Sequence, residues 1–250
     1  MHTRLSMGLT ALLALLTLVG CGTAHTARPL GKGNTSLNVG LGGPIAEVAG
    51  ATIPVPLPTV TVKHGVTDRH DLLVGWHVMP ALMGAAAFDL GGSWYFADQH
   101  KGRPGLSTAA VLHTLFNRSD SWFAVDTNLV ASWQLHPRHL IYVGFHLFVA
   151  PVEPEVVDSG PLHFAPLLGG EVRLGKRKRF GLGLELKWAD PWTDTTFMIV
   201  EYATTRGSLS VSGGFNFYLG DGSERKAKKA AALEARHSLD GAMAETGGAR

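Results

Sequence analysis

The chain has 250 residues, of which 17% are charged and 31 are glycine, and its formal net charge is +2. Soluble domains average about 25% charged residues, so this composition favours a sheet with one face in lipid and argues against a disordered chain. The small net charge excludes the basic footprint of a nucleic-acid-binding protein. Beyond the N-terminus, no apolar run of about 18 residues predicts a helical membrane span.

The N-terminal residues 1–20 have the layout of a secretory signal peptide. Their apolar run ends Leu18-Val19-Gly20-Cys21, which resembles the lipobox of bacterial lipoproteins. The resemblance implies cleavage before Cys21 and acylation of its thiol and amine, with palmitate. It also implies sorting to the outer membrane, because Gly22 follows in place of the Asp that resembles an inner-membrane retention signal. Residues 21–33 would then form a lipidated tether. An ordinary signal peptide with a chance cysteine is the alternative.

Alternation of apolar and polar residues recurs from residue 34 to residue 219 and is clearest from Trp122 to Leu135. Successive strand side chains point to opposite faces, so a period of two predicts β-strands. The length of this stretch and its aromatic ends, Phe123 and Trp133, are typical of a tilted strand in a membrane. Ten strands are predicted, at residues 34–42, 59–66, 71–79, 85–96, 106–116, 122–135, 140–149, 164–174, 180–188 and 207–219.

The connections between these strands alternate in length, as those of bacterial outer-membrane barrels do. Four connections would lie on the periplasmic side, at 67–70, 97–105, 136–139 and 175–178, and three of these four are very short. The long connections, at 43–58, 150–163 and 189–206, would lie outside. An even strand count returns both chain ends to the periplasm, where an acylated Cys21 must sit. The predicted fold is all-β, an antiparallel up-and-down transmembrane barrel of about ten strands, with eight or twelve also compatible.

Residues 34–219 therefore resemble the small outer-membrane β-barrel proteins of Gram-negative bacteria. The repeated strands, the turn from Gly65 to Leu72 and the ending from Ser212 to Leu219 carry the resemblance. The ending is similar to the signal read by the barrel-assembly machinery, so the resemblance implies that machinery and outer-membrane lipid as partners. Residues 220–250 are interpreted as a helix-prone, then disordered periplasmic tail, either solvated or contacting peptidoglycan or a periplasmic protein.

The inward faces of the predicted strands collect polar and charged side chains. We expect them to pair inside a narrow lumen, because an unpaired buried charge is costly. Gln134 is expected on the same inward face. His77, His113 and His146, on inward or ambiguous faces, are interpreted as further polar lumen residues, and no catalytic, cofactor or metal site is predicted. The predicted lumen cluster consists of Asp89, Asp126, Asn128, Glu171, Arg173, Glu185 and Lys187.

The leading prediction is an outer-membrane lipoprotein whose polar lumen has a structural or small-solute pore role, and which is not an enzyme. The alternative is a lipid-anchored soluble periplasmic barrel that binds an apolar ligand, as a lipocalin does. In that alternative the two faces of the sheet are reversed, with apolar side chains inside. A lipid-modifying barrel enzyme is the third hypothesis.

Overall fold

A computed structural model describes most of the region predicted to form the barrel. The described residues are 27–48, 50–100, 102–118, 121–136, 138–149, 161–175, 179–194 and 202–219. Residues 1–20, Cys21 and the 220–250 tail lie outside this set, so the predictions made for them rest on sequence alone.

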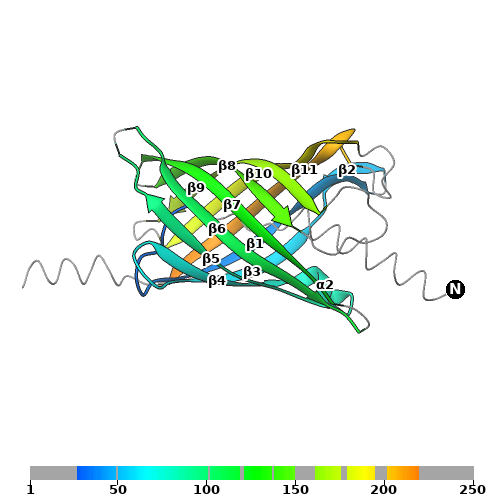
Figure 1. Cartoon of the computed structure of the whole chain (residues 1–250), viewed down its shortest axis with the longest axis horizontal. Helices are drawn as coiled ribbons and strands as arrows, with labels where there is room; N and C mark the ends of the chain where they lie inside the picture. The colour runs from blue at the N-terminus through cyan, green and yellow to red at the C-terminus, as the bar shows by residue number, and fades with distance from the viewer. Residues whose placement is uncertain are drawn as a thin grey trace, which may run out of the picture.

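Ten strands form one closed antiparallel sheet, in which each strand pairs with its neighbour in the chain and β11 pairs with β1 (Figure 1). The predicted all-β, ten-stranded barrel is confirmed. Its strands are β1 (Thr35–Val48), β3 (Leu57–Gly65), β4 (His70–His77), β5 (Ala86–Ala97), β6 (Gly105–Phe116), β7 (Ser121–His136), β8 (His139–Val149), β9 (Leu162–Leu174), β10 (Phe180–Asp194) and β11 (Arg206–Leu219).

Two short elements lie outside the ring of ten strands. Strand β2 (Ala51–Pro54) pairs with the end of β1, and helix α2 (Val78–Leu82) follows β4 directly. Both lie at the same end of the barrel in Figure 1. Among the described residues, no helix is long and apolar enough to cross a membrane.

The barrel is apolar outside and polar inside. Large apolar side chains are exposed on every one of the ten strands, with Leu184 62% and Leu90 60% exposed. The buried positions between them carry Ser, Thr, Asn, His and charged residues, such as Asn38, Thr61 and Glu185. A soluble lipocalin-like barrel needs the reverse orientation, so the observed faces argue against that alternative.

Two segments predicted as loops are partly strand. The range 43–58 was expected to be a long loop, but β1 continues to Val48 and turns back through β2. The range 189–206 was expected to be a connection, but β10 continues to Asp194. Both extensions protrude at the end that carries the long connections. There, prolines and irregular pairing are tolerated, because these segments do not have to continue the closed ladder.

Candidate functional site

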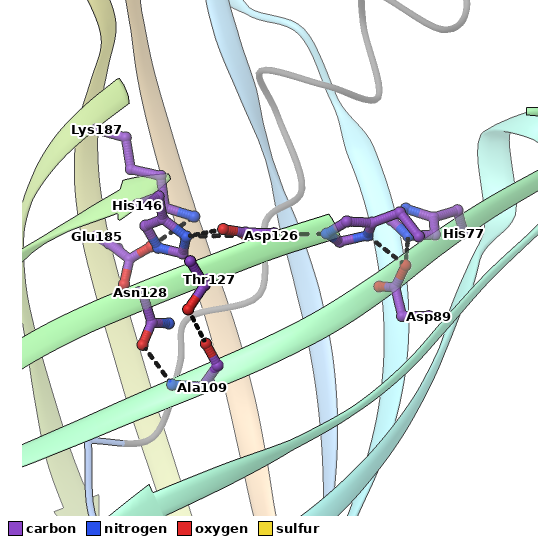
Figure 2. Close-up of polar contacts among 10 residues, drawn as sticks. His77, Asp89, Ala109, Asp126, Thr127, Asn128, His146, Glu185 and Lys187 are labelled. Carbon is purple, nitrogen blue, oxygen red and sulfur yellow. Dashed lines mark hydrogen bonds and ion pairs between the residues drawn. The ribbon is translucent and has the colours of Figure 1, made fainter. Parts of the chain in front are cut away.

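Five buried side chains from five consecutive strands form a histidine–aspartate chain inside the lumen. His77 Nε2 and His113 Nδ1 lie 2.8 Å and 2.7 Å from the same oxygen, Oδ1 of Asp89. His146 Nδ1 lies 2.9 Å from both carboxylate oxygens of Asp126. Figure 2 shows Asp126 between the labelled His146 and His77, with Asp89 below His77.

His113 joins the two halves of this chain. Its Nδ1 faces Asp89 and its Nε2 lies 3.8 Å from Oδ2 of Asp126. Each of these three residues is at most 9% exposed. Two carboxylates and three imidazoles are thus withdrawn from water together, and their charges must be balanced within the cluster.

Strand register explains why these residues meet. Asp89 on β5 stands directly opposite His113 on β6, and opposite Gly75 on β4. A side chain at position 75 would crowd the carboxylate, because an added Cβ there would lie 2.9 Å from Oδ2 of Asp89. Glycine leaves the room that lets His77, two residues further along β4, reach Asp89 diagonally.

A second buried network joins β8 to β10. The hydroxyl of Tyr142 donates to Oε2 of Glu185 at 2.9 Å, and Nζ of Lys187 lies 2.9 Å from Oε1 of the same carboxylate. Tyr142 is 1% exposed and Glu185 is 1% exposed. Both oxygens of this carboxylate are therefore engaged, as burial of an ionised group requires.

A third network lies on β9 and β11. Nε of Arg173 donates to Oε1 of Glu171 at 2.9 Å, and the guanidinium lies 4.2 Å from the ring centre of Tyr218. Glu171 with Arg173, and Glu185 with Lys187, each pair within one strand. The four were predicted to lie on adjacent strands, and β9 and β10 are paired neighbours in the sheet.

The predicted lumen residues all lie on inward-facing positions, but they do different things. Asn128 accepts the backbone N–H of Ala109 at 2.9 Å and so fastens β6 to β7. The expectation for Gln134 is wrong: it is exposed beyond the lumen, and its backbone pairs with the side chain of Gln99. The histidines are the larger omission from the predicted cluster. Only the register of β4 to β8 brings them beside Asp89 and Asp126.

Residues 27–34, called here the N-terminal strap, cross one mouth of the barrel. Ala27 packs among side chains of β7, β8 and β9, including Leu140 and Tyr142. Three residues later, the N–H of Leu30 lies 3.3 Å from both carboxylate oxygens of Asp71 on β4. Because β4 and β8 lie on different sides of the ring of strands, the strap spans the opening between them.

Backbone contacts hold the far end of the strap. The N–H of Gly33 donates to the carbonyl of Gly65 at 2.7 Å, and the N–H of Gly65 donates to the carbonyl of Asn34 at 2.8 Å. An added Cβ at Gly65 would overlap the carbonyl of Gly31. Arg28 lies near Glu171 and Arg173, and partial burial together with the charge of Arg173 lowers its pKa.

The chain was compared with protein families, curated protein sequences and solved structures, and it is similar only to solved structures. No protein-family model and no curated protein sequence matches the chain. Among solved structures, an outer membrane channel from Pseudomonas putida F1 aligns with TM-score 0.45 and 11% identity over 78% of this chain and 98% of that one. The NanC porin aligns with TM-score 0.42 and 8% identity over 73% and 98%. Outer-membrane expressed OmpT of Vibrio cholerae aligns with TM-score 0.29 and 12% identity over 73% and 56%.

The prediction that the chain is not an enzyme does not stand. A closed antiparallel barrel does not exclude enzyme activity, because the same fold serves unrelated functions.

Because the strap is hydrogen-bonded to the barrel, we expect slow amide exchange in residues 27–34. Leu30→Pro tests whether the contact with Asp71 holds the strap in place. Proline has no N–H to donate to Asp71, and a hydrogen bond to a charged group contributes about 1.5–3 kcal/mol. We expect the remaining strap amides to exchange at least about tenfold faster, measured by hydrogen–deuterium exchange on the folded barrel. Leu30→Ala keeps the N–H and is the matched control. Equal exchange in both variants would show that Asp71 does not hold the strap.

Proposed function

We propose that the protein is an outer-membrane β-barrel whose narrow polar lumen passes small solutes, with a preference for cations. The observation that supports this most directly is the reversal of an ordinary core: apolar side chains are exposed on all ten strands and ionised ones are buried inside. In a bilayer, an apolar exterior is stabilised by lipid, and a closed ladder leaves no backbone group unpaired.

The width of the lumen follows from the strand number. Barrels of about eight strands have interiors filled by side chains, whereas those of about 16–18 strands leave an aqueous channel. Ten strands lie near the filled limit, and the lumen-facing Tyr142, Glu185 and Asn216 are each at most 2% exposed. Water and small ions match this width better than metabolites or peptides do.

The charge of the lumen supports a preference for cations. Rings of carboxylates attract cations in pores. The described strands turn five carboxylates and three basic side chains inward: Asp71, Asp89, Asp126, Glu171 and Glu185, against Lys63, Arg173 and Lys187. The strap adds Arg28 near one mouth.

The orientation and the anchor are part of the same proposal. Thr35 pairs with Leu219, so both ends of the barrel sequence lie at the mouth that the strap crosses. With that mouth in the periplasm, an acylated Cys21 six residues before Ala27 reaches the inner leaflet of the outer membrane. The 220–250 tail would follow Leu219 into the periplasm, available to peptidoglycan or a periplasmic protein. Insertion would use the barrel-assembly machinery.

Current through the folded barrel in a planar bilayer tests the pore. We expect small unitary steps and a reversal potential on the cation side under a KCl gradient. Glu185→Gln and Lys187→Gln remove opposite charges from one ion pair, so they form a matched pair. Two unit charges 4 Å apart interact by about 1 kcal/mol in water, so each variant should change the ratio of cation to anion permeability several-fold. Glu185→Gln should lower this ratio and Lys187→Gln should raise it. A folded barrel with no conductance above the bare bilayer would rule the pore out.

Acylation is tested separately by metabolic labelling with palmitate. We expect the label on the wild-type protein, because the lipobox resemblance makes Cys21 the single acceptor among 250 residues. Cys21→Ser should lose the label completely while the barrel still shows heat-modifiable migration on a detergent gel. Label retained by Cys21→Ser would contradict the anchor and leave the barrel unaffected.

A further inference from the structure

Three side chains of the histidine–aspartate chain, all of types that bind metal ions, bring their donor atoms close together in the lumen. His77 Nε2, a carboxylate oxygen of Asp89 and a ring nitrogen of His113 all lie within 4.8 Å of one another. The three side chains come from β4, β5 and β6 and are 6%, 2% and 7% exposed. Two imidazoles and a carboxylate converge there from rigid strands, and neighbouring strands fix their spacing.

The proton count at His113 points to a positive charge at this place. A neutral imidazole carries one proton, but His113 has a carboxylate beside each ring nitrogen: Asp89 at 2.7 Å and Asp126 at 3.8 Å. A single proton would leave one ring lone pair facing a carboxylate. A second proton on His113, or a cation between His113 and one of these carboxylates, would relieve that repulsion.

A cation on the Asp89 side satisfies all of these groups. Nδ1 of His113 would then be a ligand, and Nε2–H would point to Asp126. Metal-bound histidines commonly donate their second ring N–H to a carboxylate, which fixes the tautomer and the ring orientation. Asp126 is itself held by His146 Nδ1 at 2.9 Å, so the second carboxylate is oriented in the same way.

A small cavity adjoins the three ligands. Besides His77, Asp89 and His113, its walls include the apolar side chains of Ala87, Leu115, Trp122 and Phe148. Trp122 and Phe148 stack with ring centroids 6.1 Å apart. Three protein ligands beside a cavity leave a fourth position for water or a small ligand, the arrangement of open zinc sites.

We propose that His77, Asp89 and His113 bind one divalent transition-metal ion in the lumen, with Zn²⁺ the first candidate. Nitrogen and carboxylate donors suit Zn²⁺ and related ions, whereas Mg²⁺ and Ca²⁺ take oxygen ligands. Tetrahedral bonds of about 2.0–2.2 Å separate donor atoms by about 3.4 Å. The 2.7 Å and 2.8 Å separations at Asp89 therefore need only small side-chain shifts.

The site lies toward the mouth that carries helix α2. His77 is the last residue of β4, and α2 starts at the next residue. Pro80 is the buried residue of this helix. The strap crosses the other mouth, so an ion would enter past α2. Neither the ligand geometry nor this route depends on whether the barrel conducts, so the metal site and the pore stand or fall separately.

Titration of the metal-free, folded full barrel with ZnCl₂ tests the site, using calorimetry. We expect one equivalent of Zn²⁺ to bind to the wild type. Asp89→Asn, which preserves side-chain shape, should weaken binding at least about 100-fold. Asp126→Asn should weaken it about 10–100-fold, because a carboxylate behind the ligand orients it. His163→Gln is the matched control, since His163 and Asp190 form a partly buried pair at 2.6 Å on β9 and β10.

Two further measurements keep the result decisive. His136 and His139 lie close together in an exposed turn, with ring centroids 5.3 Å apart, so every titration uses a background in which both are Gln. Co²⁺ is then bound in place of Zn²⁺, with all lumen residues wild type. This measurement does not depend on a lumen variant folding. The bound Co²⁺ should give the intense visible absorption of a tetrahedral ion. Absence of that spectrum, or Zn²⁺ binding that survives Asp89→Asn, would overturn the proposal.

Discussion

Closure of β1 onto β11 is the constraint on which the rest of the structure depends. Ten consecutive pairs join the two strands, from Thr35 with Leu219 to Pro44 with Ser210. Inside the seam, the side-chain amide of Asn38 donates to Oδ1 of Asn216 at 2.8 Å. With the ring closed, no sheet edge is left in the wall, and an apolar solvent can surround strands whose backbone groups are already paired.

Closure also determines the chemistry of the interior. Period-two alternation puts one half of every strand's side chains outside, where they are apolar, and the other half into a space too narrow to hydrate them fully. Charges there meet protein partners: Glu185 meets Tyr142 and Lys187, and Asp126 meets His146. The histidine–aspartate chain follows from the same confinement, because it links five consecutive strands through side chains that are buried in the lumen.

The barrel could be predicted from the sequence because the alternation of apolar and polar residues is visible within each strand, whichever strand pairs with it. The ten strands, their order and the short turns could be predicted in this way. The hairpin of β1 and β2 could not, because Pro44 and Pro54 are typical of loops. In the structure Pro44 is the last β1 residue paired with β11, Ile45 pairs with Pro54 beyond it, and the carbonyl of Pro44 accepts the N–H of Val55 at 2.8 Å.

The candidate site was less predictable than the fold, for a physical reason. Asp89 and Asp126 were predicted to lie in the lumen, but their partners depend on cross-strand register, which alternation does not determine. His113 stands 24 residues from Asp89 along the chain and 2.7 Å from it in space. The path of residues 27–34 across the mouth depends likewise on Asp71 and Gly65, which no local pattern connects to Leu30 or Gly31.

The membrane-facing exterior is the central claim, and quenching of tryptophan fluorescence by lipids brominated on their acyl chains tests it most directly. Trp188 is 42% exposed on the outer face of β10, whereas Trp122 lines the cavity in the lumen. In variants that each retain one of these tryptophans, we predict strong quenching of Trp188 and little quenching of Trp122 in folded, reconstituted protein. Equal quenching of the two, or quenching of Trp122 alone, would contradict a barrel with its apolar face in lipid.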